Sequence, residues 1–224
     1  VSDLKDINHL IKEDDYLHKV GYSERGNVPI EYYLSEQWFL KMENLAKPAS
    51  NAVRNKEINF YPNHWVKTYN HWMDNIQDWC ISRQLYWGHQ IPVWYKKDAD
   101  RANQDNWFVS TTPPADLENW EQDDDVLDTW FSSWLWPFAV HGWPEVKTTK
   151  YFPTNALVTG PDIIFFWVAR MIMSGYEFMG DLPFKDVYFT SILRDDKGRK
   201  LSKSLGNSPC LLYTSDAADD MASV

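Results

Sequence analysis

The chain has 224 residues, with 22 lysines and arginines against 32 aspartates and glutamates, so its formal net charge is −10. A composition of 44% hydrophobic and 24% charged residues is typical of a globular protein and excludes a disordered chain. The 2 cysteines exclude a disulfide framework and a four-cysteine zinc site. No apolar run reaches the roughly 18 residues that a membrane span needs. The acidic balance also argues against a protein held on nucleic acid by its global charge alone.

The first predicted helix follows a polar, mixed-charge segment. Leu34, Trp38, Met42 and Leu45 recur at helical spacing, which predicts one face of an amphipathic helix. Because proline disrupts a helix interior, we expect this helix to close before Pro48.

A second helix is predicted after Pro62, with Asn63 as its N-cap. Its apolar stripe, which we expect to pack in the core, consists of Trp65, Tyr69, Trp72, Met73, Ile76 and Trp79. The segment IPVWY (91–95) then predicts a short buried strand. The polar stretch from Lys96 to Asp125 is expected to be a solvated loop.

The second half of the chain has the pattern of a βαβ unit. NALVTG (155–160) predicts a strand, 162–178 an apolar helix capped by Asp162, and DVYFTSIL (186–193) a second strand. Parallel strands end at one edge of their sheet, and ligands bind beyond that edge in open α/β folds. We therefore expect residues 159–162 and 193–196 to emerge side by side.

A basic segment, KGRKLSKSLGN (197–207), follows the second strand. Ammonium groups, hydroxyls and a glycine-rich backbone together suit phosphate oxygens. Its position after a strand of an otherwise acidic chain favours a phosphate site over an ordinary basic surface loop.

Two further sets of residues each have two interpretations, one functional and one structural. Gly160 and Asp162 suit the approach of a nucleotide and the binding of its ribose, but Asp162 is equally expected as a simple helix cap. Trp130, Ile163 and Trp167 are able to wall a small apolar pocket, although their spacing alone favours core packing.

Several segments occur together, in order and spacing, in one enzyme family. KLSKS (200–204) resembles the KMSKS signature of class I aminoacyl-tRNA synthetases, with Leu201 in place of methionine. Residues 78–95, 125–138 and 158–188 resemble the valyl-tRNA synthetase pattern, and residues 21–31 and 34–42 fit the exit from the editing domain of that family.

The resemblance implies an α/β fold with a Rossmann-like parallel sheet, the second half of a class I catalytic domain and hence incomplete. Residues 1–30 would be the end of the editing domain and a connector. Residues 31–207 would be the C-terminal half of the catalytic domain, with a polar insertion at about 96–124. Residues 208–224 are foreign to the family pattern and are expected to be a non-native tail.

The resemblance also implies roles for the residues of the nucleotide site. Lys200, Ser202 and Lys203 would form the catalytic loop that stabilises the pyrophosphate of ATP. Gly160 and Asp162 would hold the adenosine ribose, so that ATP is bound by these two residues together with both lysines.

The remaining assignments concern the amino acid. Trp130, Ile163 and Trp167 would receive the isopropyl group of valine. The nearby residues Arg83, Trp87 and His89 receive no assigned role, and a structural role is the favoured interpretation.

The implied reaction is the ATP-dependent activation of valine to valyl-adenylate and its transfer to tRNA(Val). The implied partners are therefore tRNA(Val), valine and ATP with Mg²⁺; no zinc is expected, because residues 96–124 contain no cysteine. The full-length protein would be a cytoplasmic monomer without a membrane contact. The chain begins with Val1 and lacks the H-x-G-H signature, so we expect an internal fragment that is inactive alone. The alternatives are an isoleucyl- or leucyl-tRNA synthetase fragment and a non-catalytic nucleotide-binding module.

Overall fold

The computed structural model describes residues 1–23, 26–146, 150–201 and 205–207. It divides into two units, Val1–Glu36 and a larger unit that begins at Gln37. The first unit contains the short helix α1 (Ser2–Asp6) and an isolated antiparallel bridge between Tyr22 and Pro29. Most of its described residues are exposed, which agrees with the polar sequence.

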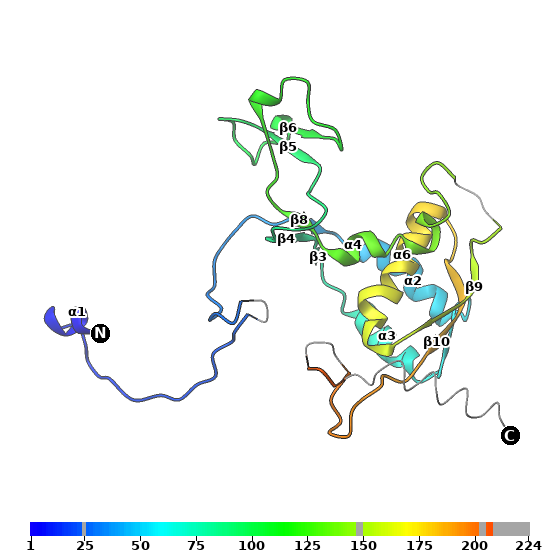
Figure 1. Cartoon of the computed structure of the whole chain (residues 1–224), viewed down its shortest axis with the longest axis horizontal. Coiled ribbons are helices and arrows are strands. Elements are labelled where there is room, and N and C mark those ends of the chain that lie inside the picture. Colours follow the sequence, from blue (N-terminus) through cyan, green and yellow to red (C-terminus); the bar gives the residue numbers. More distant parts are fainter. Residues whose placement is uncertain (24–25, 147–149, 202–204, 208–224) are drawn as a thin grey trace. The chain divides into compact units, whose positions relative to one another are not determined.

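The larger unit contains a parallel sheet of three strands, which lies beside its helices (Figure 1). Its strands are β2 (Asn59–Tyr61), β10 (Phe184–Phe189) and β9 (Thr154–Thr159), in that spatial order. Val187 of the central strand lies opposite Phe60 and Leu157. The predicted strand–helix–strand unit is therefore confirmed, since β9 and β10 pair in parallel and a helical segment connects them.

Helices cover one face of this sheet. They are α2 (Glu43–Arg54), α3 (Trp65–Asp74) and the connection between β9 and β10, which consists of η3 (Pro161–Ile163), η4 (Ile164–Ala169), α6 (Arg170–Ser174) and η5 (Gly175–Met179). The core between the two layers contains Phe60, Tyr69, Met171 and Val187, all fully buried. On the other face, Tyr61 and Tyr188 stack at 4.8 Å and remain about half exposed.

The first predicted helix is wrong in its position. The structure has the strand β1 (Phe39–Leu40) and then α2, which contains Pro48 in its interior. Leu34 is 98% exposed, so it joins no helix face. The buried face of α2 is made of Ala46, Ala49, Ala52 and Val53 instead. These small residues let α2 pack closely, and that packing outweighs the helix bond that proline cannot make.

The second predicted helix is confirmed as α3, but its cap is wrong. Its N-cap is His64, which makes no side-chain capping bond, and Asn63 lies one residue before it. Tyr69 and Met73 are buried as predicted, whereas Trp72 is 49% exposed. Trp79 belongs to the strand β3 (Trp79–Cys80), which pairs with β1.

Asp162 does not cap the helix that follows β9. It lies inside the tight turn η3, and Gly160 occupies the N-cap position without a side-chain bond. The helix continues through the π-helical segments η4 and η5 with α6 between them. It ends at Gly180, whose φ of +70° is the left-handed conformation that glycine adopts without strain.

The segment from Lys96 to Asp125 is not a loop. The predicted strand 91–95 appears as β5 (Val93–Lys96), and it pairs on both sides with β6 (Trp107–Val109) and β7 (Trp120–Gln122). The short turns η1 (Gln104–Asn106) and η2 (Leu117–Asn119) complete this small antiparallel sheet. The buried Asp123 accepts hydrogen bonds from Trp38 Nε1 and Tyr95 Oη at 2.8 and 2.7 Å. A run of acidic residues is usually exposed to solvent, so the sequence predicted an exposed side chain for Asp123. It is buried because Trp38 and Tyr95, which are distant in sequence, donate hydrogen bonds to it.

Short elements connect the small antiparallel sheet to the helices. They are β4 (Ser82–Arg83), β8 (Val126–Leu127), α4 (Thr129–Ser133) and α5 (Trp136–Ala139), and β4 pairs with β8. In the described residues, no helix is long and apolar enough to cross a membrane.

Tyr69 provides a test of the core. Its buried hydroxyl donates to the backbone oxygen of Ala49 at 3.0 Å, and burial raises the pKa of the phenol. We expect Tyr69→Phe to lower the free energy of unfolding by about 1 kcal/mol, because the Ala49 carbonyl loses its side-chain donor. Chemical denaturation of the chain measures this, with the exposed Tyr32→Phe as the control. Equal stability of both variants would contradict the packing of α3 on α2.

Candidate functional site

The two parallel strands β9 and β10 end level with each other. Phe189 pairs with Thr159, and Thr190 N donates to Thr159 O at 2.9 Å. Residues 160–162 follow β9, and the segment that leads to Lys200 follows β10. The ammonium of Lys200 lies 2.7 Å from Asp162 Oδ2. The two strands therefore end at one edge of the sheet, as predicted, although β10 ends at Phe189 rather than at Leu193. The contact with Asp162 is made by Lys200, which lies beyond the predicted segment 193–196.

The carboxylate of Asp162 explains the glycine beside it. The φ of Gly160 is −78°, so the backbone conformation itself would accept any residue. A Cβ at this position would lie 2.6 Å from Asp162 Oδ1, so a larger residue would require the carboxylate to shift from its present position. Glycine leaves room for the carboxylate where it lies, at the end of the strand.

The basic segment after β10 is organised around Asp195. Its carboxylate accepts from the backbone nitrogens of Lys197 and Arg199, from Arg199 Nε and from Asn207 Nδ2, all within 3.0 Å. These bonds lower the pKa of Asp195, and the bond from Asn207 contributes most to that shift. Arg199 thus shapes the segment, whereas Lys200 reaches across to Asp162. Ser202 and Lys203 lie outside the described residues.

Two of the three predicted pocket residues lie on adjoining elements. Trp130 belongs to α4, and Trp167 belongs to η4, where its Nε1 donates to the backbone oxygen of Ser133 at 3.0 Å. The ring of Trp130 stacks on Phe166 with centroids 5.9 Å apart. Both indoles are half-buried and pack against the main core, so they suit a pocket wall and a core edge alike.

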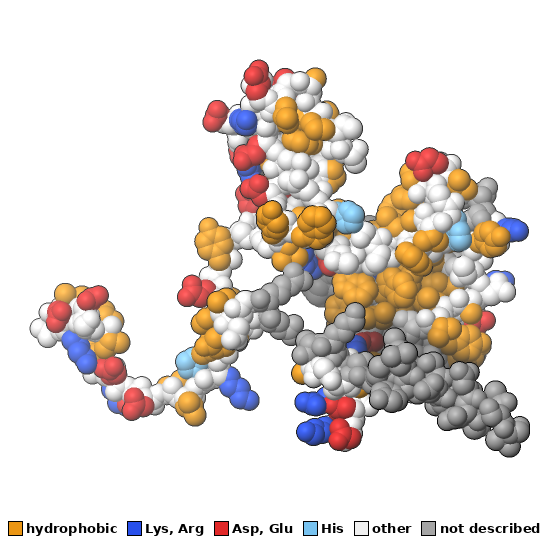
Figure 2. Space-filling view, viewed as in Figure 1, with side chains coloured by type: hydrophobic (Ala, Val, Ile, Leu, Met, Phe, Trp, Pro, Cys, Tyr) orange, Lys and Arg blue, Asp and Glu red, His pale blue; other side chains and the backbone are white. Residues whose placement is uncertain are grey.

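Ile163 lies at the end of η3, one turn before Trp167, and is half-buried. Figure 2 shows hydrophobic side chains gathered over the helical face that contains η4. Phe166 is 46% exposed there, and Trp72 stacks on Phe165 at 4.9 Å. An apolar surface therefore continues outward from the Trp130–Trp167 pair.

The sequence analysis missed Asp128 and Arg170. Asp128 is the N-cap of α4, and a signal existed, because aspartate directly before a short helix is a usual cap. Arg170 is the one charged residue of the apolar run 163–173. Both side chains are more than nine-tenths buried and lie 3.7 Å apart.

Of the three residues that the sequence left without a role, Arg83 and His89 make hydrogen bonds within the fold. Arg83 donates to the backbone oxygens of Cys80 and Ser82 and to Asp128. The backbone oxygen of His89 accepts from Leu127 N at 2.7 Å, whereas Trp87 is 88% exposed. Across the described part of the chain, no group of three or more His, Cys, Asp or Glu side chains is placed to hold a metal ion.

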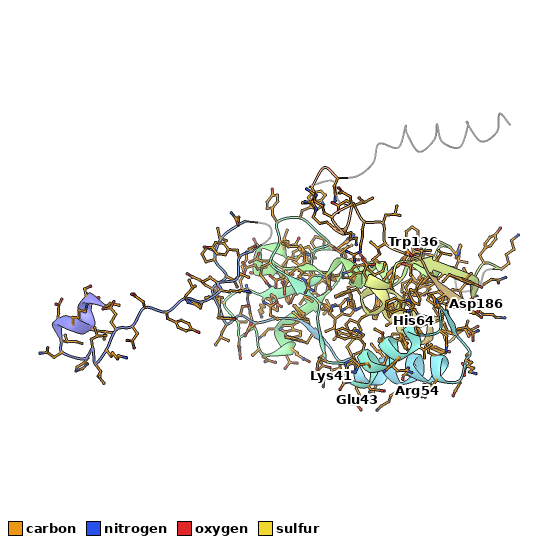
Figure 3. All side chains as sticks on the ribbon, turned by 90° about the horizontal axis from the view of Figure 1, so that it is seen from below. Lys41, Glu43, Arg54, His64, Trp136 and Asp186 are labelled. Carbon is orange, nitrogen blue, oxygen red and sulfur yellow. The ribbon has the colours of Figure 1, made fainter. Side chains whose placement is uncertain are left out.

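A groove elsewhere on the larger unit offers no competing site. It lies between α2 and α3 and is lined by Glu43, Ala46, Lys47, Ser50, Asn51, Arg54, Met73, Asp74 and Ile76. Figure 3 shows Glu43 and Arg54 on the outer side of α2. Its charges pair with each other, as Lys47 does with Glu43 and Arg54 with Asp74. The groove therefore shows no preference for a charged ligand.

The family model described as "tRNA synthetases class I (I, L, M and V)" matches residues 2–221. The chain belongs to this family. It is 58% identical over 218 residues to the valine–tRNA ligase of Chlorobaculum tepidum, which covers 93% of the chain and 24% of that protein. The valine–tRNA ligase of Bacillus subtilis is 54% identical over 211 residues, covering 92% of the chain and 23% of that relative. The chain thus spans about a quarter of the length of these curated relatives.

The comparison with solved structures concerns the fold. A crystal structure of Mycobacterium tuberculosis methionyl-tRNA synthetase bound by methionyl-adenylate superposes with a TM-score of 0.58 at 18% identity, over 88% of the chain and 34% of that protein. A second structure of the same enzyme gives a TM-score of 0.60. The predicted fold class, part of a Rossmann-like class I catalytic domain, is confirmed.

Proposed function

We propose that the chain is part of the catalytic domain of a valine–tRNA ligase, which activates valine with ATP and transfers it to tRNA(Val). The observation that carries the choice of valine is the 58% identity to a valine–tRNA ligase over 93% of the chain. The geometry supports the same reaction, because a basic segment and a carboxylate meet at the strand ends, and the Trp130–Trp167 pair belongs to the same larger unit.

The reaction proceeds in two steps. An oxygen of the valine carboxylate attacks the α-phosphorus of ATP, the bond between the α- and β-phosphates breaks, and pyrophosphate leaves with the electron pair. A hydroxyl of the terminal tRNA ribose then attacks the acyl carbon, loses its proton, and AMP leaves. Neither step needs a protein nucleophile, so the site acts by positioning and by stabilising the phosphate charge.

In this proposal, the ion pair between Lys200 and Asp162 is the state of the nucleotide site before ATP binds. The two side chains are 61% and 39% exposed, and an ion pair of this kind is worth about 0–1 kcal/mol. The hydroxyls of the ribose can therefore displace Lys200 at little cost. Lys200 then becomes available, with Ser202 and Lys203, to neutralise the departing pyrophosphate, which Mg²⁺ accompanies as part of the nucleotide substrate.

The valine side chain would lie against Trp130, Ile163 and Trp167. Such an apolar wall discriminates between side chains that differ by one methylene group by only about 1–3 kcal/mol, and synthetases of this class are the usual example of this limit.

We further propose that residues 1–30 end an editing domain, that 31–207 belong to the catalytic domain with an insertion at about 96–124, and that 208–224 are a non-native tail. The complete enzyme would act as a cytoplasmic monomer without zinc.

The proposal is tested in a chimaera in which residues 37–207 replace the corresponding part of the Bacillus subtilis valine–tRNA ligase. We expect the chimaera to catalyse valine-dependent exchange of pyrophosphate into ATP. The isolated chain should not, because it spans about a quarter of such enzymes. A folded chimaera without exchange would contradict the proposal, and exchange by the isolated chain would contradict the expected division of the site.

Asp162 gives a prediction specific to the nucleotide. In the chimaera, we expect Asp162→Asn to raise the KM for ATP about tenfold, because hydrogen bonds to a charged group are worth about 1.5–3 kcal/mol. The KM for valine should change little. Asp196→Asn, in the same edge region, is the control. If both substitutions leave the KM for ATP unchanged, Asp162 does not hold the ribose.

A further inference from the structure

A buried charge cluster joins the two elements that contain Trp130 and Trp167. Asp128 Oδ2 accepts from Trp79 Nε1 at 2.9 Å and from Arg83 Nη2 at 2.8 Å, and Arg170 Nη1 lies 3.7 Å away. The side chains of Asp128 and Arg170 are 9% and 6% exposed. One buried carboxylate thus faces two guanidinium groups, that of the buried Arg170 and that of the partly exposed Arg83.

Burying the charge of Arg170 opposes folding, so stability alone does not explain this cluster. Burial lowers the pKa of Arg170 to about 10, although Asp128 opposes this shift, so the group is still charged at neutral pH. Its Nε and Nη1 atoms are buried without a hydrogen-bond partner. Replacing a whole buried ion pair with apolar residues is often neutral or stabilising, so a buried pair is weak evidence for a role in stability. The presence of Arg170 in an otherwise apolar helix therefore points to a role beyond stability.

The geometry of Arg170 indicates that role. Its guanidinium lies flat against Trp79, with Cζ 3.5 Å from the ring centroid, and it also approaches Phe165 and Phe166. It is the first residue of α6, directly after the π-helical segment η4 that contains Trp167. π-Helical turns occur often at functional sites, where they shift the side chains that follow.

Asp128 contacts the helix α4, which contains Trp130. Its Oδ1 accepts from the backbone nitrogen of Trp130 at 3.3 Å and so fixes the first turn of α4. At the end of α4, Ser133 O accepts from Trp167 Nε1. The helix α4 is therefore tied to η4 and α6 at both ends, once by the ion pair and once by the indole.

We infer that Asp128 and Arg170 are positioning residues that set the separation of Trp130 and Trp167, and thereby the size of amino acid side chain that the site accepts. The inference rests on the proposed function, in which the two tryptophans contact the substrate side chain. It predicts that weakening the cluster changes amino acid selectivity more than it changes nucleotide binding.

The test uses Asp128→Asn and Arg170→Met in the chimaera, with kcat and KM measured for valine, isoleucine and ATP. We expect the preference for valine over isoleucine in kcat/KM to fall about tenfold in both variants, since small misplacements at a distance cost up to about a hundredfold. The KM for ATP should stay within about twofold. Arg170→Lys, which keeps the charge, should recover part of the preference.

Arg101→Met is the matched control. Arg101 also pairs with an acid, Glu121 at 2.8 Å, and lies over an aromatic ring, that of Tyr95, but it belongs to the antiparallel sheet. We expect its selectivity to equal that of the parent chimaera. We expect Arg170→Met to lower the unfolding temperature, because removing one member of a buried pair is destabilising even though Asp128 keeps its bonds to Trp79 and Arg83. Arg170→Lys, which keeps the charge, remains informative even if Asp128→Asn does not fold.

The outcomes separate the inference from the proposed function. A parent chimaera that activates valine, with variants of unchanged selectivity, would overturn the positioning role alone. A joint loss of kcat, ATP binding and thermal stability would also overturn it, because that pattern marks a structural role. A folded parent chimaera without valine activation would refute the proposed function instead.

Discussion

Replacement of Lys200 by alanine is expected to slow valine-dependent pyrophosphate exchange in the chimaera by about 10²–10³-fold, the usual loss when one group that stabilises transition-state charge is removed. Lys200 is placed for this role because its ammonium reaches the carboxylate at the end of β9. The effect should fall on kcat and leave the KM for valine nearly unchanged, since the charge that Lys200 would neutralise develops only as pyrophosphate leaves.

Lys197→Ala is the control for this prediction. Lys197 lies in the same basic segment, but only its backbone nitrogen contacts Asp195, so its side chain is not needed to shape the segment. Lys203→Ala should resemble Lys200→Ala if both lysines act on the pyrophosphate. If Lys197→Ala and Lys200→Ala lose equal activity, the segment contributes only general positive charge, and a specific role for Lys200 is wrong.

Replacement of Trp167 by alanine is expected to reduce the preference for valine over isoleucine by about tenfold or more, because a pocket distinguishes a methylene by about 1–3 kcal/mol only while its wall is in place. The same change should lower the free energy of unfolding by about 3–5 kcal/mol, since Trp167 also packs against the core. Exchange with each amino acid and thermal unfolding measure the two effects separately.

Trp167→Phe separates the size of the ring from its hydrogen bond. Phenylalanine keeps most of the apolar bulk but removes the donor to Ser133 O. We expect it to retain most of the selectivity and to lose about 1 kcal/mol of stability. Unchanged selectivity in Trp167→Ala would mean that Trp167 is only a core residue.

The parts of the fold that the sequence predicted well are those with local signals. The strands of the βαβ unit and β5 are short apolar runs with turns beside them, and α3 has a strong periodic stripe. The α2 helix was misplaced because its buried face consists of alanines, which give little hydrophobic contrast, and because Pro48 was taken as a boundary. Tertiary packing decided both points.

In the candidate site too, features with a local sequence signal were predictable and features that depend on tertiary packing were not. The shared edge at which β9 and β10 end was predictable, because neighbouring parallel strands end at one edge of their sheet. The contact of Lys200 with Asp162 was not predicted from the sequence. The helix cap assigned to Asp162 was wrong, since its carboxylate turns to Lys200 instead. The Asp128–Arg170 pair was not predictable, because its residues are far apart in sequence and only the fold brings them together.

The most direct test of the account is the amino acid dependence of pyrophosphate exchange in the chimaera that contains residues 37–207. Valine, isoleucine, leucine and methionine are compared at equal concentration with saturating ATP, with the unmodified Bacillus subtilis enzyme as reference. We predict strong exchange with valine and much weaker exchange with the other three. A folded chimaera that prefers isoleucine, leucine or methionine, or that binds ATP without any amino acid dependence, would contradict the assignment to valine activation.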